Sequence, residues 1–459
     1  MAARARPHVE VGGRIRYHCR DKLSMKKTVR RFTPEGLLSI YHYLLALAAA
    51  IRYGFPSRRI VTIGVTGTKG KTSTANFIWS CLSAGGIHAG IITTANIRIG
   101  KEEILNAYHM TMPGPFTIQR LLRQMVDAQC THCVIETTSE GLKQHRNVGI
   151  QYDIGVFTNL FPEHLPSHGG SFDTYKKMKG RMFASLGTRR RKMLGNGQVE
   201  KVIIANAASE HAPYFLGFPA DRKITFAVGK KADYTAEDVQ SSDSGVAFKV
   251  GDAGFKLSIP GAFNVSNALP AIVISRLAGI DDASIARGLV SLSVIPGRME
   301  RIEEGQNFTV FVDYAHEGES MRNVLETAAS MRAPGGRIIV LLGAEGGGRD
   351  KAKRPIMGEL CGKMADYVIV SNVDPYEDDP IEILEDVAVA AEKAGKTRDT
   401  NLFVIEDRRA GIQKALSLAA VGDIVLITGK GAEQSITIGG RKFDWDDRIV
   451  VREELKKLP

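Results

Sequence analysis

Apolar runs alternate with amphipathic stretches along most of the chain. Near-continuous β-branched and aliphatic runs, typical of buried strands, occupy residues 60–66, 89–94, 133–138 and 154–159. Between the second and third of these runs, residues 117–126 space their apolar side chains as one face of a helix does. Strands that are apolar on both faces and alternate with helices predict a parallel sheet with helices on both sides.

A second series of apolar runs lies at residues 308–312, 337–342, 367–370 and 424–427. Between the two series, residues 222–260 alternate with a period of two and are interrupted by glycines, which predicts small antiparallel additions. The joint between the two series is expected near Pro296-Gly297.

Near the N-terminus, residues 36–51 are apolar, and arginines flank them on both sides: Arg30, Arg31, Arg52, Arg58 and Arg59. Sixteen residues are fewer than the roughly 20 that a membrane span needs. Two interpretations remain open, a helix packed on the protein and a helix that lies on an anionic membrane surface. We favour packing, with a weak membrane contact as the alternative.

The length of 459 residues allows two or three domains, and 44% hydrophobic and 24% charged residues are ordinary for a globular protein. Five cysteines are too few and too scattered for a secreted disulfide framework, which favours the cytoplasm.

The net charge of +11 is confined to one region. Residues 1–59 hold thirteen Lys and Arg against three Asp and Glu, a balance of +10, so the rest of the chain carries about +1. A broad basic face on the globular part is therefore not expected, and we predict no nucleic-acid partner.

The first apolar run leads into a glycine-rich loop followed by a helix-like stretch. Two glycines let the backbone turn its N–H groups toward anionic oxygens at the start of a helix. Lys71 would reach the terminal phosphates of a nucleotide, and the Thr72 hydroxyl would bind Mg²⁺. The strict phosphate-loop pattern is not met, since Val65 stands at its first glycine; a turn that binds nothing is the alternative. The nucleotide-binding residues predicted here are Thr66, Gly67, Thr68, Lys69, Gly70, Lys71, Thr72 and Ser73.

We therefore expect an α/β protein in three parts. Residues 1–58 form a short basic segment with an apolar helix, and residues 59–297 form a central ATP-binding domain with a parallel sheet like that of P-loop ATPases. Residues 298–459 form a Rossmann-like C-terminal α/β domain. The second series has no phosphate loop of its own, which favours a role on the substrate side.

Polar residues follow several of the predicted strands: Glu136, Asn159, Asp313 and His316. In open α/β sheets, ligands bind at the carboxyl ends of the strands. Glu136 could hold Mg²⁺ there, or it could simply cap a helix. His164 follows Asn159 in a loop, where a single histidine is as often structural as functional.

Seven motifs carry a family resemblance: Thr66-Gly-Thr-Lys-Gly-Lys-Thr72, Thr158-Asn-Leu-Phe-Pro-Glu-His164, Tyr175-x-x-x-Lys179-x-x-Met-Phe183, Gly261-Ala-Phe-Asn264-Val-Ser-Asn267-Ala, Pro296-Gly-Arg298-Met-Glu300, Asp313-Tyr-Ala-His316 and Gly429-Lys430-Gly431. Their order resembles that of the Mur ligases, over about residues 59–445. The most similar branch adds the third amino acid to the peptidoglycan precursor.

The resemblance implies ATP-dependent amide ligation, in which a substrate carboxylate becomes an acyl phosphate and an amine then displaces phosphate. It implies two Mg²⁺ ions, with Lys71, Glu136, His164 and Lys179 as catalytic residues and Thr72, Glu136, His164 and Lys179 as metal ligands. Lys179 matches a lysine that this family carbamylates. Asn264 and Asn267 match residues at the adenine side, and Arg298, Asp313 and His316 match residues that close the C-terminal domain over the nucleotide.

The implied partners are a UDP-muramoyl peptide and a free amino acid, bound by a monomer. The substrate residues implied are Thr111, Thr138, Ser139, Arg146, Asp374, Tyr376, Lys430 and Glu433.

Three departures from the family pattern stand out. The usual N-terminal uridine-nucleotide domain has no counterpart before residue 59, and Glu140 replaces a histidine. The motif that selects diaminopimelate ends here in Tyr376 instead of arginine, and tyrosine cannot clamp a carboxylate with two parallel hydrogen bonds. The acidic residues 377–379 then favour a diamino acid such as lysine or ornithine, unless another residue reads diaminopimelate or the acidic run is only a solvated face.

Other functions remain open at this point. Folylpolyglutamate synthases, and ligase-like subunits that act on a lipid-linked precursor, share part of these motifs. A nucleotide-binding module without ligase activity is a further alternative, but it would have no need of Lys71, Glu136 and Lys179 together.

Overall fold

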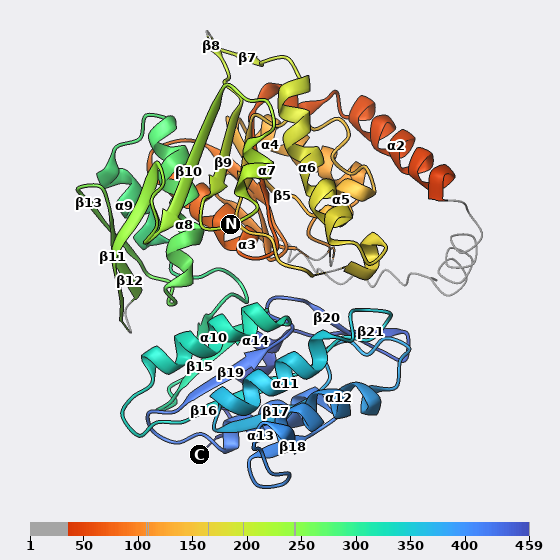
Figure 1. Ribbon diagram of the computed structural model, residues 1–459, viewed down its shortest axis with the longest axis vertical. Coiled ribbons are helices and arrows are strands. Elements are labelled where there is room, and N and C mark those ends of the chain that lie inside the picture. The colour runs from red at the N-terminus through yellow and green to blue at the C-terminus, as the bar shows by residue number, and fades with distance from the viewer. Residues whose placement is uncertain are drawn as a thin grey trace, which may run out of the picture.

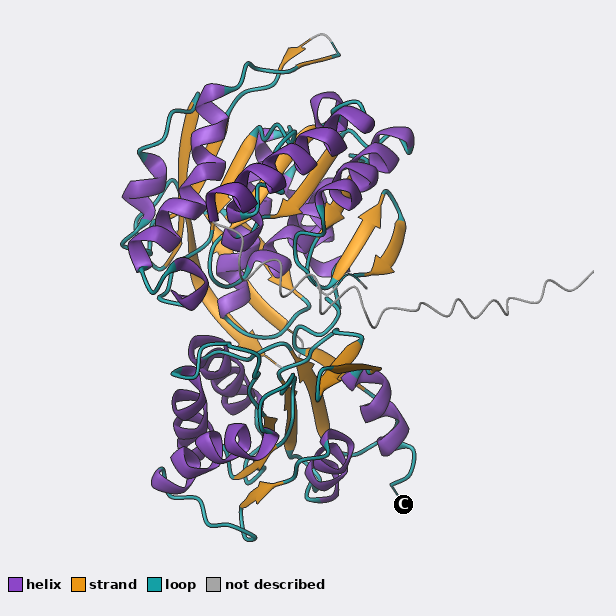
Figure 2. Ribbon diagram, turned by 90° about the vertical axis from the view of Figure 1, so that its right-hand side faces the viewer, coloured by secondary structure: helices purple, strands orange, loops and turns teal. Residues whose placement is uncertain are grey.

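The computed structural model describes residues 35–458, except for residues 107, 109, 164, 196, 243, 244. The expectations for residues 1–34 and for His164 lie outside the described residues. Two sheets, each covered by helices on both faces, form the upper and lower parts of the molecule (Figures 1 and 2). The predicted α/β class is confirmed.

The upper sheet has eleven strands in the order β13-β12-β11-β10-β9-β6-β1-β5-β2-β3-β4. Its central strands, from β9 through β6, β1 and β5 to β2, are all parallel. The strands are β1 (Val61–Thr66), β2 (Ala89–Ile92), β3 (Asn96–Ile99), β4 (Glu102–Leu105), β5 (His132–Glu136), β6 (Ile154–Phe157), β9 (Val202–Asn206), β10 (Arg222–Val228), β11 (Tyr234–Ser242), β12 (Gly245–Val250) and β13 (Ala253–Leu257).

Alternate side chains of these strands enter two separate cores. On one face, Ile63 and Val65 pack with Phe77 and Ile78, and on the other, Ile135 and Phe157 pack with Phe183. Apolar residues on both sides explain why the strands read as continuous runs. The helices of the first face are α3 (Lys71–Ala84), α8 (Phe263–Leu277) and α9 (Asp282–Ser291); those of the second are α4 (Pro115–Asp127), α5 (Ser139–Lys143), α6 (Phe172–Thr188) and α7 (Ala212–Leu216).

The prediction for residues 222–260 is correct in part. β12 and β13 are antiparallel, but β10 and β11 pair in parallel and continue the main sheet. The period-two pattern misled us because β10 and β11 lie toward the edge of the sheet, where one face is exposed and polar residues alternate with buried ones even in parallel strands.

The lower sheet has six strands in the order β14-β15-β19-β16-β17-β18, all parallel except β14. Its strands are β14 (Glu300–Ile302), β15 (Thr309–Asp313), β16 (Ile338–Leu342), β17 (Tyr367–Val370), β18 (Leu402–Val404) and β19 (Ile424–Thr428). Its helices are α10 (Gly318–Met331), α11 (Lys353–Met364), α12 (Pro380–Lys393), α13 (Arg408–Ser417) and α14 (Asp447–Leu455). Four of these strands coincide with the predicted ones, whereas the short β14 and β18 were not predicted.

Short elements complete the fold. They are the hairpins β7 (Met193–Leu194) with β8 (Gly197–Gln198) and β20 (Ser435–Ile438) with β21 (Arg441–Asp444), and the 3₁₀ turns η1 (Pro56–Arg59) and η2 (Leu165–His168). Helix α2 (Glu35–Arg52) corresponds to the predicted apolar helix and lies along the outside of the upper part, next to α4 (Figure 1). Within the described residues, no helix combines the length and apolar character required to cross a bilayer.

The carboxyl ends of the central strands point toward a cleft between the two parts. β6, β1, β5 and β2 are consecutive neighbours in the upper sheet, as are β15, β19, β16 and β17 in the lower sheet. Residues that follow strands of both sheets line one cavity of about 820 Å³. The fold therefore brings together side chains that lie far apart in sequence.

Candidate active site

The phosphate loop joins the end of β1 to the start of α3. Gly70 has a φ of 79°, a left-handed conformation that other residues adopt at a cost, and a Cβ there would collide with the carboxamide of Asn267. The loop is held against the neighbouring strand, since the backbone N–H of Lys69 donates to Asn159 Oδ1 (2.8 Å) and the Thr158 hydroxyl donates to the Lys69 carbonyl (2.7 Å). The loop is therefore fixed before a ligand binds.

Glu136 lies beside the start of α3 because β5 is the direct neighbour of β1. Its Oε2 accepts hydrogen bonds from the Thr72 hydroxyl (2.9 Å) and from the backbone N–H and hydroxyl of Thr94 (2.8 and 3.0 Å). The carboxylate is buried and aimed at the loop, and carboxylate and hydroxyl oxygens are ligands that Mg²⁺ accepts. The predicted pair of Thr72 and Glu136 is thus brought into contact.

Lys71 turns back over the loop, and its Nζ donates to the Thr68 carbonyl (2.8 Å). Burial lowers the pKa of Lys71, and Glu136 offsets this effect only in part. No ion pair of Lys71 within 4 Å is found among the described residues. An anionic ligand would therefore find this amine without a competing carboxylate.

Lys179 reaches the same loop from α6. Tyr175, Lys179, Met182 and Leu186 recur at helical spacing and are all buried, so the lysine lies on the core-facing side of its helix. Its Nζ donates to the Gly67 carbonyl (2.8 Å) and lies 4.5 Å from the centre of the Tyr175 ring. Burial, followed by the neighbouring charge of Lys71, lowers the pKa of Lys179 far below its ordinary value, which favours an uncharged, nucleophilic amine.

The fourth predicted catalytic residue, His164, lies outside the described residues, so its position remains a prediction. Lys71, Glu136 and Lys179 all line the same cleft. Within the described residues, no three His, Cys, Asp or Glu side chains gather as a metal centre. Magnesium commonly takes only one or two protein carboxylates and completes its shell with substrate phosphates and water.

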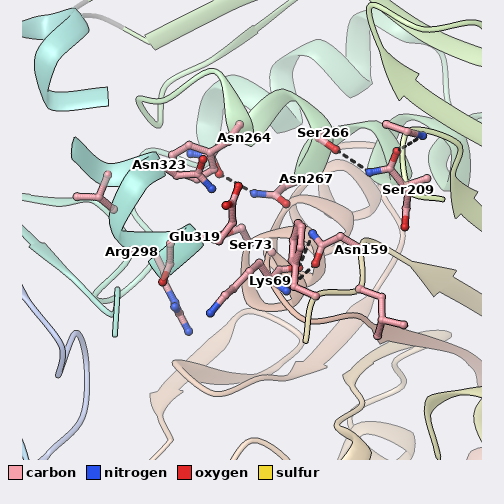
Figure 3. A pocket seen from close by; sticks show the side chains of 18 of the residues that line it. Lys69, Ser73, Asn159, Ser209, Asn264, Ser266, Asn267, Arg298, Glu319 and Asn323 are labelled. Carbon is pink, nitrogen blue, oxygen red and sulfur yellow. Dashed lines mark hydrogen bonds between the residues drawn. The ribbon is translucent and has the colours of Figure 1, made fainter. Parts of the chain in front are cut away.

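A second cavity of about 790 Å³ adjoins the loop on its other side. Asn264 and Asn267 of α8 line it, and Asn267 Nδ2 donates to Asn264 Oδ1 (3.0 Å). Glu319 and Asn323 of α10 face them from the lower part, while Lys69 and Asn159 lie at the phosphate-loop end (Figure 3). Amide groups beside the apolar Phe263 and Ile259 suit a heteroaromatic base.

The three residues expected to close over the nucleotide occupy different settings. Arg298 reaches the phosphate loop, since its Nη2 donates to the Thr72 hydroxyl (3.3 Å), and its guanidinium lies over the Tyr314 ring. Asp313 is buried, which raises its pKa, and both its oxygens accept backbone N–H groups, from Met299 and Ala315 (2.7 Å each). Asp313 therefore shapes the loop that carries Arg298.

His316 lies in the large cleft, where its Nδ1 contacts the Tyr314 carbonyl at 2.6 Å. Burial, followed by the charge of Lys353, lowers its pKa well below the ordinary value. The imidazole is thus held in its neutral form.

Four of the predicted substrate residues lie at the end of the large cleft that the upper part forms: Thr111, Thr138, Ser139 and Arg146. Thr111 contacts the Thr94 hydroxyl (2.8 Å), and the Thr138 hydroxyl accepts the Gly141 N–H (3.1 Å) as the N-cap of α5, which begins at the buried Ser139. Arg146 donates to the Met112 carbonyl and to Gln144 Oε1. These four residues come from three segments between residues 111 and 146.

Glu140, which stands where the family pattern has histidine, lines the same end. Its Oε1 accepts from Gln144 Nε2 (2.6 Å), whereas its Oε2 is buried and has no hydrogen-bond partner in the described part of the chain. A buried oxygen without a donor is costly, which favours a donor group from a ligand at this point.

The other four predicted substrate residues lie at the end of the cleft that the lower part forms: Asp374, Tyr376, Lys430 and Glu433. Lys430 is buried and contacts both Asp374 Oδ2 (2.6 Å) and Glu433 Oε2 (2.5 Å). Burial opposes the charge on Lys430, but Glu433 and Asp374 outweigh it and hold the pKa of Lys430 above its ordinary value. Tyr376 is pinned at a φ of 56° by the hydrogen bond from its N–H to the Thr437 carbonyl (3.1 Å).

The interpretation of residues 377–379 as a receptor for a cationic amine fails for two of its members. Asp378 Oδ2 accepts the Gly347 N–H (3.0 Å), and Asp379 caps α12 by accepting the Ile381 N–H (2.9 Å). Both carboxylates hold backbone turns and lie outside the lining of the cleft. Asp379 stands directly before the first residue of α12, at the N-cap position where Asp is among the preferred residues.

Sequence reasoning missed several residues of the cleft. Thr94 orients Glu136, and Lys353 forms ion pairs with Glu317 and Glu345 (3.2 Å each) at the carboxyl edge of the lower sheet. Arg349 lines the cleft nearby and hydrogen-bonds Tyr376. Glu317 directly follows the recognised His316, and residues 349–354 contain four basic side chains. Glu317 and this basic cluster could therefore have been proposed from the sequence. Nothing in the sequence marks Thr94.

The chain matches two family models. Residues 65–275 match the Mur ligase middle domain, and residues 297–431 match the Mur ligase glutamate ligase domain. A UDP-N-acetylmuramyl-tripeptide synthetase of Roseiflexus sp. is 38% identical over 93% of this chain and 84% of its own length. A UDP-N-acetylmuramoyl-L-alanyl-D-glutamate--2,6-diaminopimelate ligase of Geobacillus kaustophilus is 35% identical over 92% of this chain and 84% of its own length.

Solved structures agree on the fold. A UDP-N-acetylmuramoyl-L-alanyl-D-glutamate--2,6-diaminopimelate ligase superposes with a TM-score of 0.58 at 28% identity, over 87% of this chain and 78% of that one. A folylpolyglutamate synthase of Mycobacterium tuberculosis superposes with a TM-score of 0.65 at 20% identity, over 89% of this chain and 95% of that one, which is a likeness of fold alone.

Proposed function

We propose that this chain, which belongs to the Mur ligase family of ATP-dependent, ADP-forming amide ligases, adds a diamino acid to a UDP-muramoyl dipeptide in peptidoglycan synthesis. The substrates follow the names of the relatives that match most of the chain. The observation that carries the proposal is the meeting of Lys71, Glu136 and Lys179 at the phosphate loop, beside two adjoining cavities.

The chemistry runs in two steps. A carboxylate of the dipeptide's glutamate attacks the γ-phosphorus of ATP, ADP leaves, and an acyl phosphate forms. The amine of the incoming amino acid then attacks the acyl carbon, inorganic phosphate leaves, and the ammonium proton is lost to solvent or a base. Two anions must approach each other in the first step, so fixed positive charge between them lowers the barrier. Lys71 and Arg298 supply that charge from opposite sides of the cleft.

Magnesium ions bound here would neutralise phosphate charge and orient the phosphates for in-line transfer. Thr72 and Glu136 fit as ligands, because their oxygens already converge, and His164 is the further ligand that the family pattern implies. Lys179 fits only after modification, since an ammonium cannot bind a cation. Its amine, kept neutral by burial, could attack carbon dioxide to form a carbamate, whose oxygens would then serve as ligands.

The donor dipeptide is assigned to the end of the cleft that holds Thr111, Ser139 and Arg146, and the amino acid to the end that holds Asp374, Tyr376 and Lys430. The acceptor end carries both signs of charge, with Glu345 and Glu433 near Arg349 and Lys442. A diamino acid has both amines and carboxylate to match this mixture. One chain supplies both ends, so we propose that the enzyme acts as a monomer in the cytoplasm, where ATP is available.

The test is a product analysis. The protein is incubated with UDP-muramoyl-L-alanyl-D-glutamate, ATP, Mg²⁺ and a mixture of amino acids, and the nucleotide product is identified by mass spectrometry. We expect a mass gain of meso-diaminopimelate, lysine or ornithine less water, with one ADP per product. A product extended by a monoamino acid, or ATP turnover without any extended product, would contradict the proposal.

A further inference from the structure

Helix α2 buries three alanines against the protein and exposes a row of large side chains, while Leu38, Leu45 and Leu47 are half-buried. Ala46, Ala49 and Ala50 are fully buried, and Ala50 lies so close to Gly149 that a Cβ on that glycine would strike it. Leu37, Ile40, Tyr41, Leu44 and Ile51 are instead 56–61% exposed. A helix that only covered a core would bury its large apolar residues and expose its alanines.

The exposed residues form one continuous stripe, which we call the α2 stripe: Leu37, Ile40, Tyr41, Leu44 and Ile51. Steps of three, four and seven residues place them on a single face of the helix. Figure 1 shows α2 on the outer side of the upper part, away from the second sheet. Large apolar patches on a protein surface mark sites of contact with a partner or a membrane.

Exposed cations follow the C-terminal end of α2. Arg52, Arg58 and Arg59 are exposed, and the α6 end adds the exposed Arg189 and Arg190. The two groups are neighbours, since the Gln151 N–H donates to the Ser57 hydroxyl (3.0 Å) and Gln151 Nε2 donates to the Arg190 carbonyl (2.6 Å). No ion pair of these five arginines is found within the described residues. Residues 36–59 contain no Asp or Glu at all.

We propose that the α2 stripe and these arginines dock the protein on an anionic lipid surface. Apolar side chains would enter the boundary between head groups and acyl chains, and the arginines would meet phosphate and carboxylate groups beside them. The charge decides among possible occupants. A second copy would bring another +10 from residues 1–59 against the first, whereas an anionic bilayer complements it. The docking goes beyond the proposed ligase reaction and does not depend on it.

The docked face is connected to the cleft. The Ser39 hydroxyl contacts His145 Nε2 (2.8 Å), and the Tyr43 ring stands edge-on to the His145 ring. His145 is adjacent to Arg146, which lines the donor end of the cleft. The helix that meets the lipid therefore packs on the segment that carries a predicted substrate residue, so docking and donor binding share one structural element.

The test measures binding of the full chain to vesicles by co-sedimentation. Vesicles of phosphatidylcholine alone are compared with vesicles containing about a third phosphatidylglycerol. We expect at least tenfold tighter binding to the anionic vesicles, weakening as salt is raised. The variant Leu37→Ser/Ile40→Ser/Leu44→Ser should lose at least tenfold in affinity. The matched control Ile381→Ser/Val421→Ser/Ile449→Ser, which changes exposed apolar residues of the lower part, should bind like the unmodified protein.

A second variant, Arg58→Glu/Arg59→Glu, leaves the stripe intact and should also weaken binding to anionic vesicles while reducing its salt dependence. Circular dichroism and ATP turnover report whether each variant is folded. Unchanged binding in both folded variants would overturn the proposal. Sedimentation equilibrium without lipid tests the second-copy alternative: a dimer that the stripe variant converts to monomers, with no vesicle binding, would likewise overturn it.

Discussion

The phosphate loop and the acceptor end of the large cleft are built on different principles. At the phosphate loop, Lys71 and Lys179 lie close to each other, and no carboxylate of the described residues is in ion-pair contact with either. Both have lowered pKa values because burial disfavours their charge. At the acceptor end, Lys430 is buried but is held between Asp374 and Glu433, and its pKa is raised. The phosphate loop lacks the negative charges that a phosphate ligand would bring. At the acceptor end, Asp374 and Glu433 of the chain itself balance the charge of Lys430.

This difference teaches what each region gives to function and to stability. Buried cations without partners cost folding free energy, which a protein tolerates where a ligand is to be bound. A buried pair costs little as long as both partners remain, and much when one is removed. Removing a lysine should therefore have opposite effects on stability in the two regions.

The largest expected effect is on catalysis at the loop. Lys71→Met should lower ATP turnover about 10³-fold, because one fixed positive charge at the transferred phosphate is lost. Its free energy of unfolding should not fall, since the buried charge is removed along with its cost. Steady-state ADP release and chemical denaturation measure the two quantities. Lys101→Met, on an exposed turn, serves as control; a stable Lys71→Met enzyme with full turnover would contradict the role of Lys71.

Lys179→Ala should lower turnover about 10²-fold or more, because a proposed metal ligand disappears. Formate or acetate should restore part of the activity by placing a carboxylate in the vacated space. Unmodified protein should also lose turnover when carbon dioxide and bicarbonate are removed from the buffer, and regain it when they return. Lys177→Ala, on the exposed side of α6, should be indifferent to both treatments. Failure of Lys179→Ala to change turnover would refute the carbamate.

At the acceptor end, Lys430→Met should destabilise the fold by about 3 kcal/mol, because it leaves Asp374 and Glu433 buried without a cation. Urea denaturation measures the loss. Adding Asp374→Asn and Glu433→Gln to the same chain should recover a large part of it. If Lys430→Met were as stable as the unmodified protein, the two regions would not differ as described.

The smallest effect is expected at the donor end. Glu140→His should change the KM for the donor peptide by less than about tenfold and leave kcat nearly unchanged, because Glu140 contacts Gln144 and lies away from the reacting phosphate. Kinetics with varied donor concentration decide. A loss confined to kcat would assign Glu140 to catalysis and contradict this placement.

The comparison also explains what the sequence could predict. β1 and the phosphate loop were predictable because strand and turn follow one another in sequence. Glu136 was predictable because it ends an apolar strand of its own, and parallel strands bring their carboxyl ends together. Lys179 looked like one of several charges in residues 176–179, although Tyr175, Met182 and Leu186 shared its helical phase. The pairing of Lys430 with Asp374 was not predictable, since 56 residues separate them and the contact depends on the order of β17 and β19 in the sheet.

The central claim is that the donor carboxylate is activated as an acyl phosphate at the phosphate loop. Donor dipeptide labelled with ¹⁸O in both carboxylates of its glutamate tests this claim most directly, because attack on the γ-phosphorus carries one carboxylate oxygen into the released phosphate. We predict one ¹⁸O in each inorganic phosphate formed with product, measured by mass spectrometry or by the isotope shift in ³¹P spectra. Phosphate that contains no ¹⁸O while the amide product accumulates would contradict the account.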